Sequence, residues 1–81
     1  MQVKLLYFAQ LKEAAKMSEQ MIVLERPVTV GELVRGVLAR PEFATCRDLP
    51  FKYAMNDEFV DLEKWIEDRA VVAILPPVAG G

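Results

Sequence analysis

The sequence contains no histidine and only one cysteine, Cys46, among its 81 residues. Histidine is the side chain that most often acts as a general base or a metal ligand near neutral pH, and a nucleophile paired with it is excluded here. A single cysteine cannot form an internal disulfide or a multi-cysteine metal site. Cys46 is expected to be a small buried residue rather than a reactive thiol. These absences argue against an autonomous enzyme and against a bound metal or cofactor.

The sequence also lacks any run of basic residues. Its formal net charge is −2 and its pI is about 5.0. Nucleic acids and anionic membranes attract clustered Lys and Arg, so neither is expected as a partner. No apolar segment approaches the length of a membrane span, and the first residues lack the pattern of a signal peptide. We therefore expect a cytoplasmic location.

The chain is short but rich in apolar residues. With 81 residues it is expected to form one domain, residues 1–81, with residues 76–81 as an extended C-terminal tail. A domain of this size buries only about 60–65% of its unfolded surface. Because 53% of its residues are hydrophobic, an exposed apolar patch for a partner is expected. The alternative is densely packed β structure with an ordinary surface.

The C-terminal segment combines an apolar run, two prolines and two glycines. Residues 70–75 are typical of a strand that is buried on both faces. Pro76 and Pro77 cannot donate hydrogen bonds to a sheet, so an extended, stiff tail should begin there. Gly80 and Gly81 lack side chains and could thread a narrow channel.

The one reactive group of this tail is the terminal carboxyl group of Gly81. At neutral pH it is an ionised carboxylate and a poor electrophile. Once another enzyme converts it to a mixed anhydride, a sulfur or nitrogen nucleophile can attack it. The alternative is a frayed terminus without a function.

The first strand is expected over residues 1–9. Met1, Val3, Leu5 and Tyr7 fall on its core face, while the opposite face becomes apolar at Leu6 and Phe8. If this strand lies parallel to the last one, Phe8 and Leu75 are candidates for one docking patch. The alternative is that both fill the edge of the core.

Two helices and a second strand should follow. Residues 10–16 favour a short helix, residues 18–20 a polar break, and residues 21–24 a strand antiparallel to the first. Thr29 and Glu32 match a capping box, and the next residues form an apolar stripe: Val30, Leu33, Val34, Val37 and Leu38. Gly36 either permits a close approach or is merely tolerated.

The second half should contain three strands. Residues 42–50 predict a loop with one helical turn and an inward Phe43, and residues 51–55 and 58–60 predict two strands around an Asn56-Asp57 turn. Trp65 is expected to seal the core, and Arg69 to begin the last strand.

This order of elements predicts an α+β fold of the β-grasp (ubiquitin-like) type. It has a mixed sheet of about five strands, the first and last adjacent and parallel, and one main helix packed on one face. The other face must meet solvent or a partner. Because this fold hosts several functions, two remain open: a carrier that uses its tail, and an interaction module with an inert tail. An iron–sulfur protein is excluded because it needs four cysteines.

The sequence resembles the small subunits of molybdopterin synthase, which are ubiquitin-like sulfur carriers. The resemblance is most specific in the ending Leu75-Pro76-Pro77-Val78-Ala79-Gly80-Gly81, and residues 5–10, 11–13 and 54–60 resemble other parts of that family. One departure is visible, because residues 67–70 (Glu-Asp-Arg-Ala) replace the family's Gly-containing turn.

The resemblance implies that Gly81 is adenylated by a ubiquitin-activating-like adenylyltransferase that consumes ATP. A sulfur-delivery protein would then convert it to a thiocarboxylate. The tail would donate this sulfur inside the large subunit, where cyclic pyranopterin monophosphate becomes molybdopterin, in a heterotetramer with two small subunits. Gly80 would keep the tail slim, and the partner-binding residues would be Phe8, Leu75, Pro76, Pro77, Val78 and Ala79. Alternatives are a sulfur carrier for thiamine or tRNA thiolation and a ubiquitin-like modifier.

Overall fold

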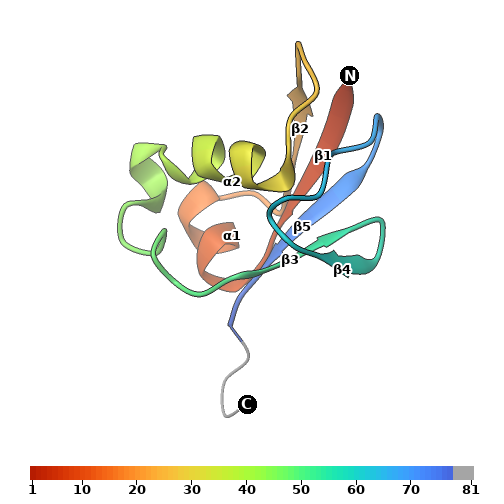
Figure 1. The fold of residues 1–81 in the computed structure, drawn as a ribbon. Helices are drawn as coiled ribbons and strands as arrows, with labels where there is room; N and C mark the ends of the chain where they lie inside the picture. The colour runs from red at the N-terminus through yellow and green to blue at the C-terminus, as the bar shows by residue number, and fades with distance from the viewer. Residues whose placement is uncertain (78–81) are drawn as a thin grey trace.

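The computed structural model describes residues 1–77, which form one mixed sheet with helices beside it (Figure 1). The elements, in chain order, are β1 (Gln2–Tyr7), α1 (Ala9–Ala15), β2 (Glu19–Val23), α2 (Val30–Leu38), the 3-10 helix η1 (Pro41–Phe43), β3 (Lys52–Met55), β4 (Glu58–Val60) and β5 (Val71–Leu75).

The sheet has the strand order β2-β1-β5-β3-β4. The first and last strands are adjacent and parallel, with Leu5 opposite Val72 and Tyr7 opposite Ile74. The other three pairs are antiparallel. This topology is the β-grasp arrangement that the order of the sequence elements predicts.

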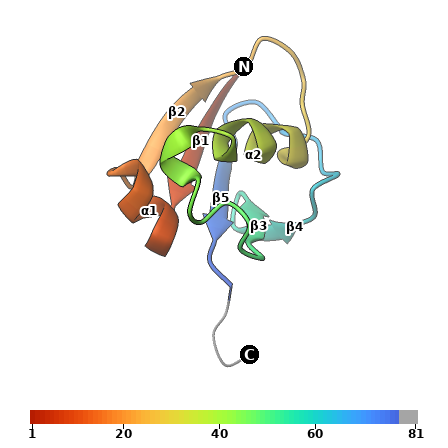
Figure 2. The same cartoon turned by 90° about the vertical axis from the view of Figure 1, so that its left-hand side faces the viewer.

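Both helices lie against the same face of the sheet (Figure 2). The core between them contains Val3, Leu5 and Tyr7 of β1, as predicted, together with Leu11 of α1 and the entire apolar stripe of α2. Met1, predicted to lie on the same core face, is 38% exposed because it precedes the strand at the rim of the sheet. The inward Phe43 is also confirmed, because it is fully buried and its ring centroid lies 5.6 Å from that of Tyr7.

The prediction that the last strand is buried on both faces is wrong. Val72 and Ile74 are fully buried, whereas Ala73 and Leu75 are half-buried and Val71 is exposed. The reason is that the described helices cover one face of the sheet, so even a central strand is only partly shielded on the other. An uninterrupted apolar run does not distinguish these two situations.

Helix α2 begins with the predicted capping box. The backbone N–H of Glu32 donates to Oγ1 of Thr29 (3.2 Å), and the backbone N–H of Thr29 donates to Oε1 of Glu32 (3.3 Å). The hydrogen bond from the Thr29 backbone, followed by that from Arg26, holds the pKa of Glu32 below its ordinary 4.5. The cap therefore satisfies amides that the first helical turn leaves unpaired.

The two glycines of α2 differ in their surroundings. A Cβ on Gly31 would lie 3.0 Å from the backbone oxygen of Leu62, so this glycine permits the segment after β4 to approach the helix. A Cβ on Gly36 would meet nothing within 4 Å. Of the two possibilities for Gly36, the structure supports simple tolerance.

Trp65 does not seal the core, because 60% of its surface is exposed. It forms an isolated bridge with Thr29, and the adjacent Ile66 donates its N–H to the carbonyl oxygen of Val28 at 3.0 Å. In extended backbone, successive side chains point to opposite sides. Ile66, only 4% exposed, therefore fills the position expected for Trp65.

Two predicted boundaries also differ. Arg69 does not begin the last strand: its φ of 63° places it in the turn, which the Ala70 N–H closes on the Glu67 carbonyl at 3.1 Å. Residues 18–20 are not simply a polar break, because β2 begins at Glu19. Polar side chains are accepted there because β2 is an edge strand with one open face. The Asn56-Asp57 turn is confirmed, with φ values of 52° and 70°.

We expect Thr29→Ala to lower the free energy of unfolding by about 1 kcal/mol, because the first turn of α2 loses its side-chain acceptor. Urea denaturation of both proteins would measure the difference. Thr45→Ala, in an exposed turn, is the matched control and should change stability little. Equal effects of the two substitutions would contradict the role of the cap.

We expect opposite effects from alanine at the two glycines. Gly36→Ala should raise the free energy of unfolding by about 0.5–1 kcal/mol, because the added methyl group has room and glycine disfavours a helix. Gly31→Ala should lower it by about 1–2 kcal/mol, because its methyl group meets the Leu62 backbone. Thermal unfolding of the pair would test the sign of each effect; the same sign for both would refute this explanation.

Candidate functional site

The sheet face away from the helices, here called the outer face, is largely apolar. Strand pairing places side chains from all five strands on it. Four of its hydrophobic residues are exposed: Met21, Val23, Phe59 and Val71. Four others are half-buried: Leu6, Ala54, Ala73 and Leu75. An exposed apolar surface of this kind, even with Lys4 between Met21 and Val71, is typical of a partner-binding site. The expected apolar patch is therefore located on this face.

The last strand leads out of the sheet at the end opposite the N-terminus (Figure 1). Strand β5 ends at Leu75, immediately before Pro76, as the missing proline N–H groups predict. Leu75 still pairs with Lys52 of β3, and Leu75, Pro76 and Pro77 are all half-buried. The chain is thus anchored to the sheet up to the residue before the first proline.

Phe8 lies at the same end of the sheet as Leu75. Tyr7 and Ile74 are opposite each other in the parallel pair, so Phe8 and Leu75 occupy the next position on adjacent strands. Phe8 has an extended backbone (φ −130°, ψ 155°), and the chain turns at Ala9, whose φ is 48°. Phe8 is 39% exposed. The structure therefore brings together the two residues that the sequence suggested for docking.

Residues 78–81 lie outside the described residues. The predicted roles of Val78, Ala79, Gly80 and Gly81 therefore stay predictions.

Sequence reasoning missed the contribution of β4 to this face. Phe59, the most exposed large hydrophobic residue with 76% of its surface accessible, lies opposite Ala54 of β3. The two-residue turn Asn56-Asp57 sets this register, because it places Met55 opposite Glu58. The next pair, Ala54 and Phe59, therefore points to the other face of the sheet, which is the outer face. Following the alternation from the turn would have identified Phe59.

Near the end of β5 the outer face carries one charged side chain, Lys52, which lies opposite Leu75. Lys4 and Glu19 form an exposed ion pair across β1 and β2, with 3.5 Å between Nζ and Oε2. On β3 and β4, Lys52 and Phe59 line a groove of about 480 Å³ that also includes Tyr53. Burial raises the pKa of Tyr53 above its ordinary 10.0, so this phenol stays neutral. Apart from Lys52, the outer-face positions next to Leu75 are apolar: Leu6, Phe8 and Ala73.

The described residues offer no other evident chemical site. Residues 1–77 contain no group of three or more His, Cys, Asp or Glu side chains that could hold a metal ion. Cys46 is buried, with 7% of its surface exposed, as expected for a structural residue. Within the same residues, no helix has the length and hydropathy needed to cross a membrane.

Comparison with known proteins gives consistent results. The model of the ThiS family matches residues 5–81. The molybdopterin synthase sulfur carrier subunit of Chlamydomonas reinhardtii is 33% identical over 84 aligned positions, which cover 100% of both chains.

Solved structures share the fold. Small archaeal modifier protein 1 of Haloferax volcanii has a TM-score of 0.81 at 21% identity, covering 95% of this chain and 98% of that one. A chain in the complex of subunits 1 and 2 of molybdopterin-converting factor from Helicobacter pylori has a TM-score of 0.70 at 24% identity, with 100% of both chains covered. Together with the anchored last strand and the apolar outer face, the match over residues 5–81 shows that this chain belongs to the ThiS family.

Proposed function

We propose that this protein is the sulfur carrier of molybdenum cofactor biosynthesis, the small subunit of molybdopterin synthase. The observation that carries the proposal is the central strand β5, which is held in the sheet as far as Leu75 and stopped by Pro76 and Pro77, with two residues between Pro77 and the Gly80-Gly81 ending. The full-length similarity to the algal sulfur carrier subunit supports the same function.

The chemistry would take place at the carboxylate of Gly81. The carboxylate attacks the α-phosphate of ATP on an adenylyltransferase, giving an acyl-adenylate and pyrophosphate. The terminal sulfur of a persulfide on a delivery protein then attacks the acyl carbon, and AMP leaves. A thiol cleaves the resulting S–S bond and leaves a thiocarboxylate on Gly81. Gly80, without a side chain, would let the tail enter a narrow channel.

The outer face would dock the large subunit, with Phe8 and Leu75 beside the emerging tail. Pro76, Pro77, Val78 and Ala79 would continue this contact into the partner. The large subunit would supply the catalytic side chains and bind cyclic pyranopterin monophosphate, and two small subunits would complete a heterotetramer. The absence of histidine from the sequence is consistent with such a non-catalytic, sulfur-donating subunit. The proposed location is the cytoplasm, and the only nucleotide involved is the ATP used by the activating enzyme.

A second candidate, a protein modifier, has support from the structural likeness to small archaeal modifier protein 1. Both functions begin with adenylation of the terminal glycine, and they differ in the nucleophile that follows. A lysine amine of a target protein would produce a stable amide, whereas a persulfide produces a thiocarboxylate. Sulfur carriers for thiamine or tRNA thiolation share the thiocarboxylate and differ only in the recipient.

Deletion of Gly81 should abolish sulfur loading, because the new terminal carboxylate, on Gly80, would lie one residue, roughly 3.5 Å, short of the activated position. The full chain and the deletion variant would each be co-expressed with the activating and sulfur-delivery enzymes of the host, and their intact masses measured. We expect a mass increase equal to the replacement of one oxygen by sulfur, in the full chain only. Binding of the large subunit should be nearly unchanged in the variant.

The outcomes separate the candidates. An unmodified full chain in the presence of a demonstrably active activating enzyme would support an interaction module with an inert tail. Stable conjugates to other proteins would support the modifier. A thiocarboxylate that the large subunit does not consume would indicate another sulfur recipient.

Phe8→Ala should weaken binding of the large subunit by about tenfold, as truncation of an aromatic interface residue often does. Folding should be largely unaffected, because Phe8 is 39% exposed and lies outside the core. Isothermal titration of each variant against the large subunit would measure the effect. Trp65→Ala is a suitable control, because Trp65 is also exposed but is not on the outer face. Unchanged affinity of Phe8→Ala would exclude Phe8 from the docking surface.

A further inference from the structure

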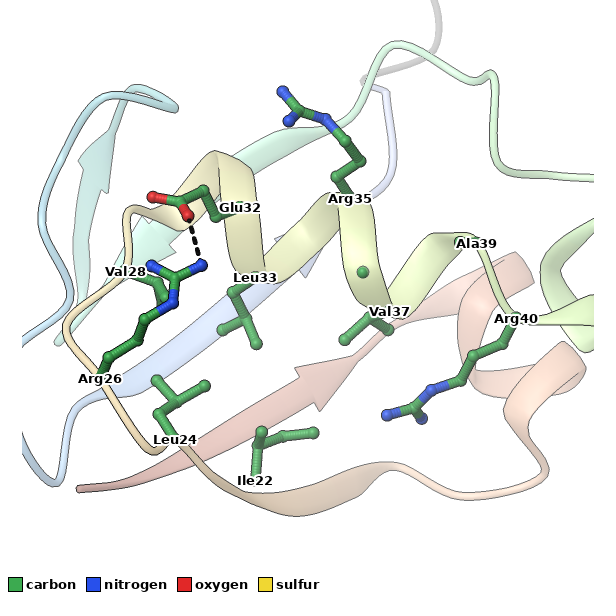
Figure 3. Close-up of a pocket in the computed structure, with 11 residues that line it drawn as sticks. Ile22, Leu24, Arg26, Val28, Glu32, Leu33, Arg35, Val37, Ala39 and Arg40 are labelled. Carbon is green, nitrogen blue, oxygen red and sulfur yellow. Dashed lines mark hydrogen bonds and ion pairs between the residues drawn. The ribbon is translucent and has the colours of Figure 1, made fainter.

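A second surface, unrelated to the tail, lies between the edge strand β2 and helix α2 (Figure 3). It is a groove of about 560 Å³. Figure 3 shows Ile22 and Leu24 pointing into it from one side and Leu33 and Val37 from the other. Gly36 also lines it. The interior of the groove is therefore apolar.

One wall of the groove is an open strand edge. Met1 and Leu24 exchange backbone hydrogen bonds, and the Tyr7 N–H donates to the carbonyl oxygen of Ser18. In an antiparallel pair the bonded positions alternate, so the backbone groups of Glu19, Met21 and Val23 face away from β1. No other strand of residues 1–77 pairs with that side of β2. Such an edge can accept an additional strand.

The rim of the groove is positively charged, although the whole chain carries a net charge of −2. Arg26 and Arg40 lie at its rim, whereas the side chain of Arg35, which also lines it, points away from it (Figure 3). Among the described residues that line it, the one carboxylate is Glu32, and Arg26 already pairs with it at 3.2 Å. Arg40 donates to the neutral side chain of Gln20 at 2.8 Å. Among residues 1–77 no carboxylate lies within ion-pair distance of the Arg40 guanidinium group, which lies beside an apolar cleft.

We propose that this edge and groove bind an extended, acidic peptide segment of a partner protein by β-strand addition. The backbone of the segment would pair with the outward amides and carbonyls of Glu19, Met21 and Val23. Alternate apolar side chains would enter the groove beside Ile22 and Leu24, as residues of one strand face do. Carboxylates flanking the apolar positions would meet Arg40.

The charge pattern disfavours a second copy of this chain as the occupant. Edge-to-edge pairing of two β2 strands, with the helices on one common face, would bring the arginine rims of both copies together. Like charges placed opposite each other destabilise such a contact. An acidic segment has no such penalty.

This site is independent of the proposed sulfur transfer. Strand β1 separates β2 from β5 in the sheet, and the groove opens on the side that the helices cover (Figure 2). A peptide bound there would leave the outer face and the end of β5 free. The same molecule could therefore hold two partners at once.

The test uses the full chain and a synthetic peptide of about ten residues, with valines at alternate positions and glutamates at one end. We expect saturable binding that weakens as salt is added, and a control peptide with lysines in place of the glutamates should bind much less. Hydrogen exchange followed by NMR should slow at the amides of Met21 and Val23. Exchange at Gln20 and Ile22, which already bond to β1, should change little.

Two variants sharpen the test. Arg40→Gln should weaken binding of the acidic peptide by about fivefold, while Lys64→Gln, an equal change of charge outside the groove, should not. Met21→Pro removes one outward N–H, which an edge strand tolerates, and should also reduce binding. If Met21→Pro fails to fold, the comparison of Arg40→Gln with Lys64→Gln still tests the proposal.

Several results would overturn the proposal. These are equal affinity for the acidic and lysine-containing peptides, protection confined to β3, β4 and β5, and absence of binding. Protection of Met21 and Val23 that grows with protein concentration, without peptide, would assign the edge to a second copy instead.

Discussion

The parallel pairing of β1 with β5 is the contact on which the rest of the fold depends. These strands lie at the centre of the sheet: β2 joins it only through β1, and the β3–β4 hairpin only through β5. Their buried side chains, Val3, Leu5, Val72 and Ile74, are fully inaccessible and form the floor of the core. Because the two strands come from opposite ends of the chain, this pairing closes the domain. It also places the end of β5 next to Phe8.

The helices cover only one face of that sheet, and this asymmetry creates the candidate docking surface. An 81-residue chain has too little material to build a second covering layer, so the outer face keeps apolar residues in contact with solvent. Contact between apolar side chains and water is unfavourable, so burial of this face by a partner would lower the free energy. In the proposed function, a partner docked on this face would also meet the end of β5 at Leu75.

The two surfaces of this small domain use different interactions. The outer face offers hydrophobic side chains, whereas the β2 edge offers backbone hydrogen bonds and arginine charges beside a narrow apolar groove. Shape and hydrophobic contact would select a partner at the first, while charge and strand pairing would select one at the second. The groove lies on the helix-covered side of β2 and the outer face on the opposite side, so the two partners would approach the sheet from different sides.

Local signals in the sequence determined much of this protein. The capping box at Thr29, the stripe of α2, the Asn56-Asp57 turn and the stop at Pro76 each depend on neighbouring residues, and each is found where the sequence predicts it. The Gly80-Gly81 ending is likewise a property of the sequence alone. Only the tertiary structure shows which side of each helix or strand is covered. The sequence could not show that Trp65 points outward, that β5 is shielded on one face, or that Phe59 lies on the outer face. The face that a residue shows depends on register and on layers formed by distant segments, and a change of one residue in register reverses it.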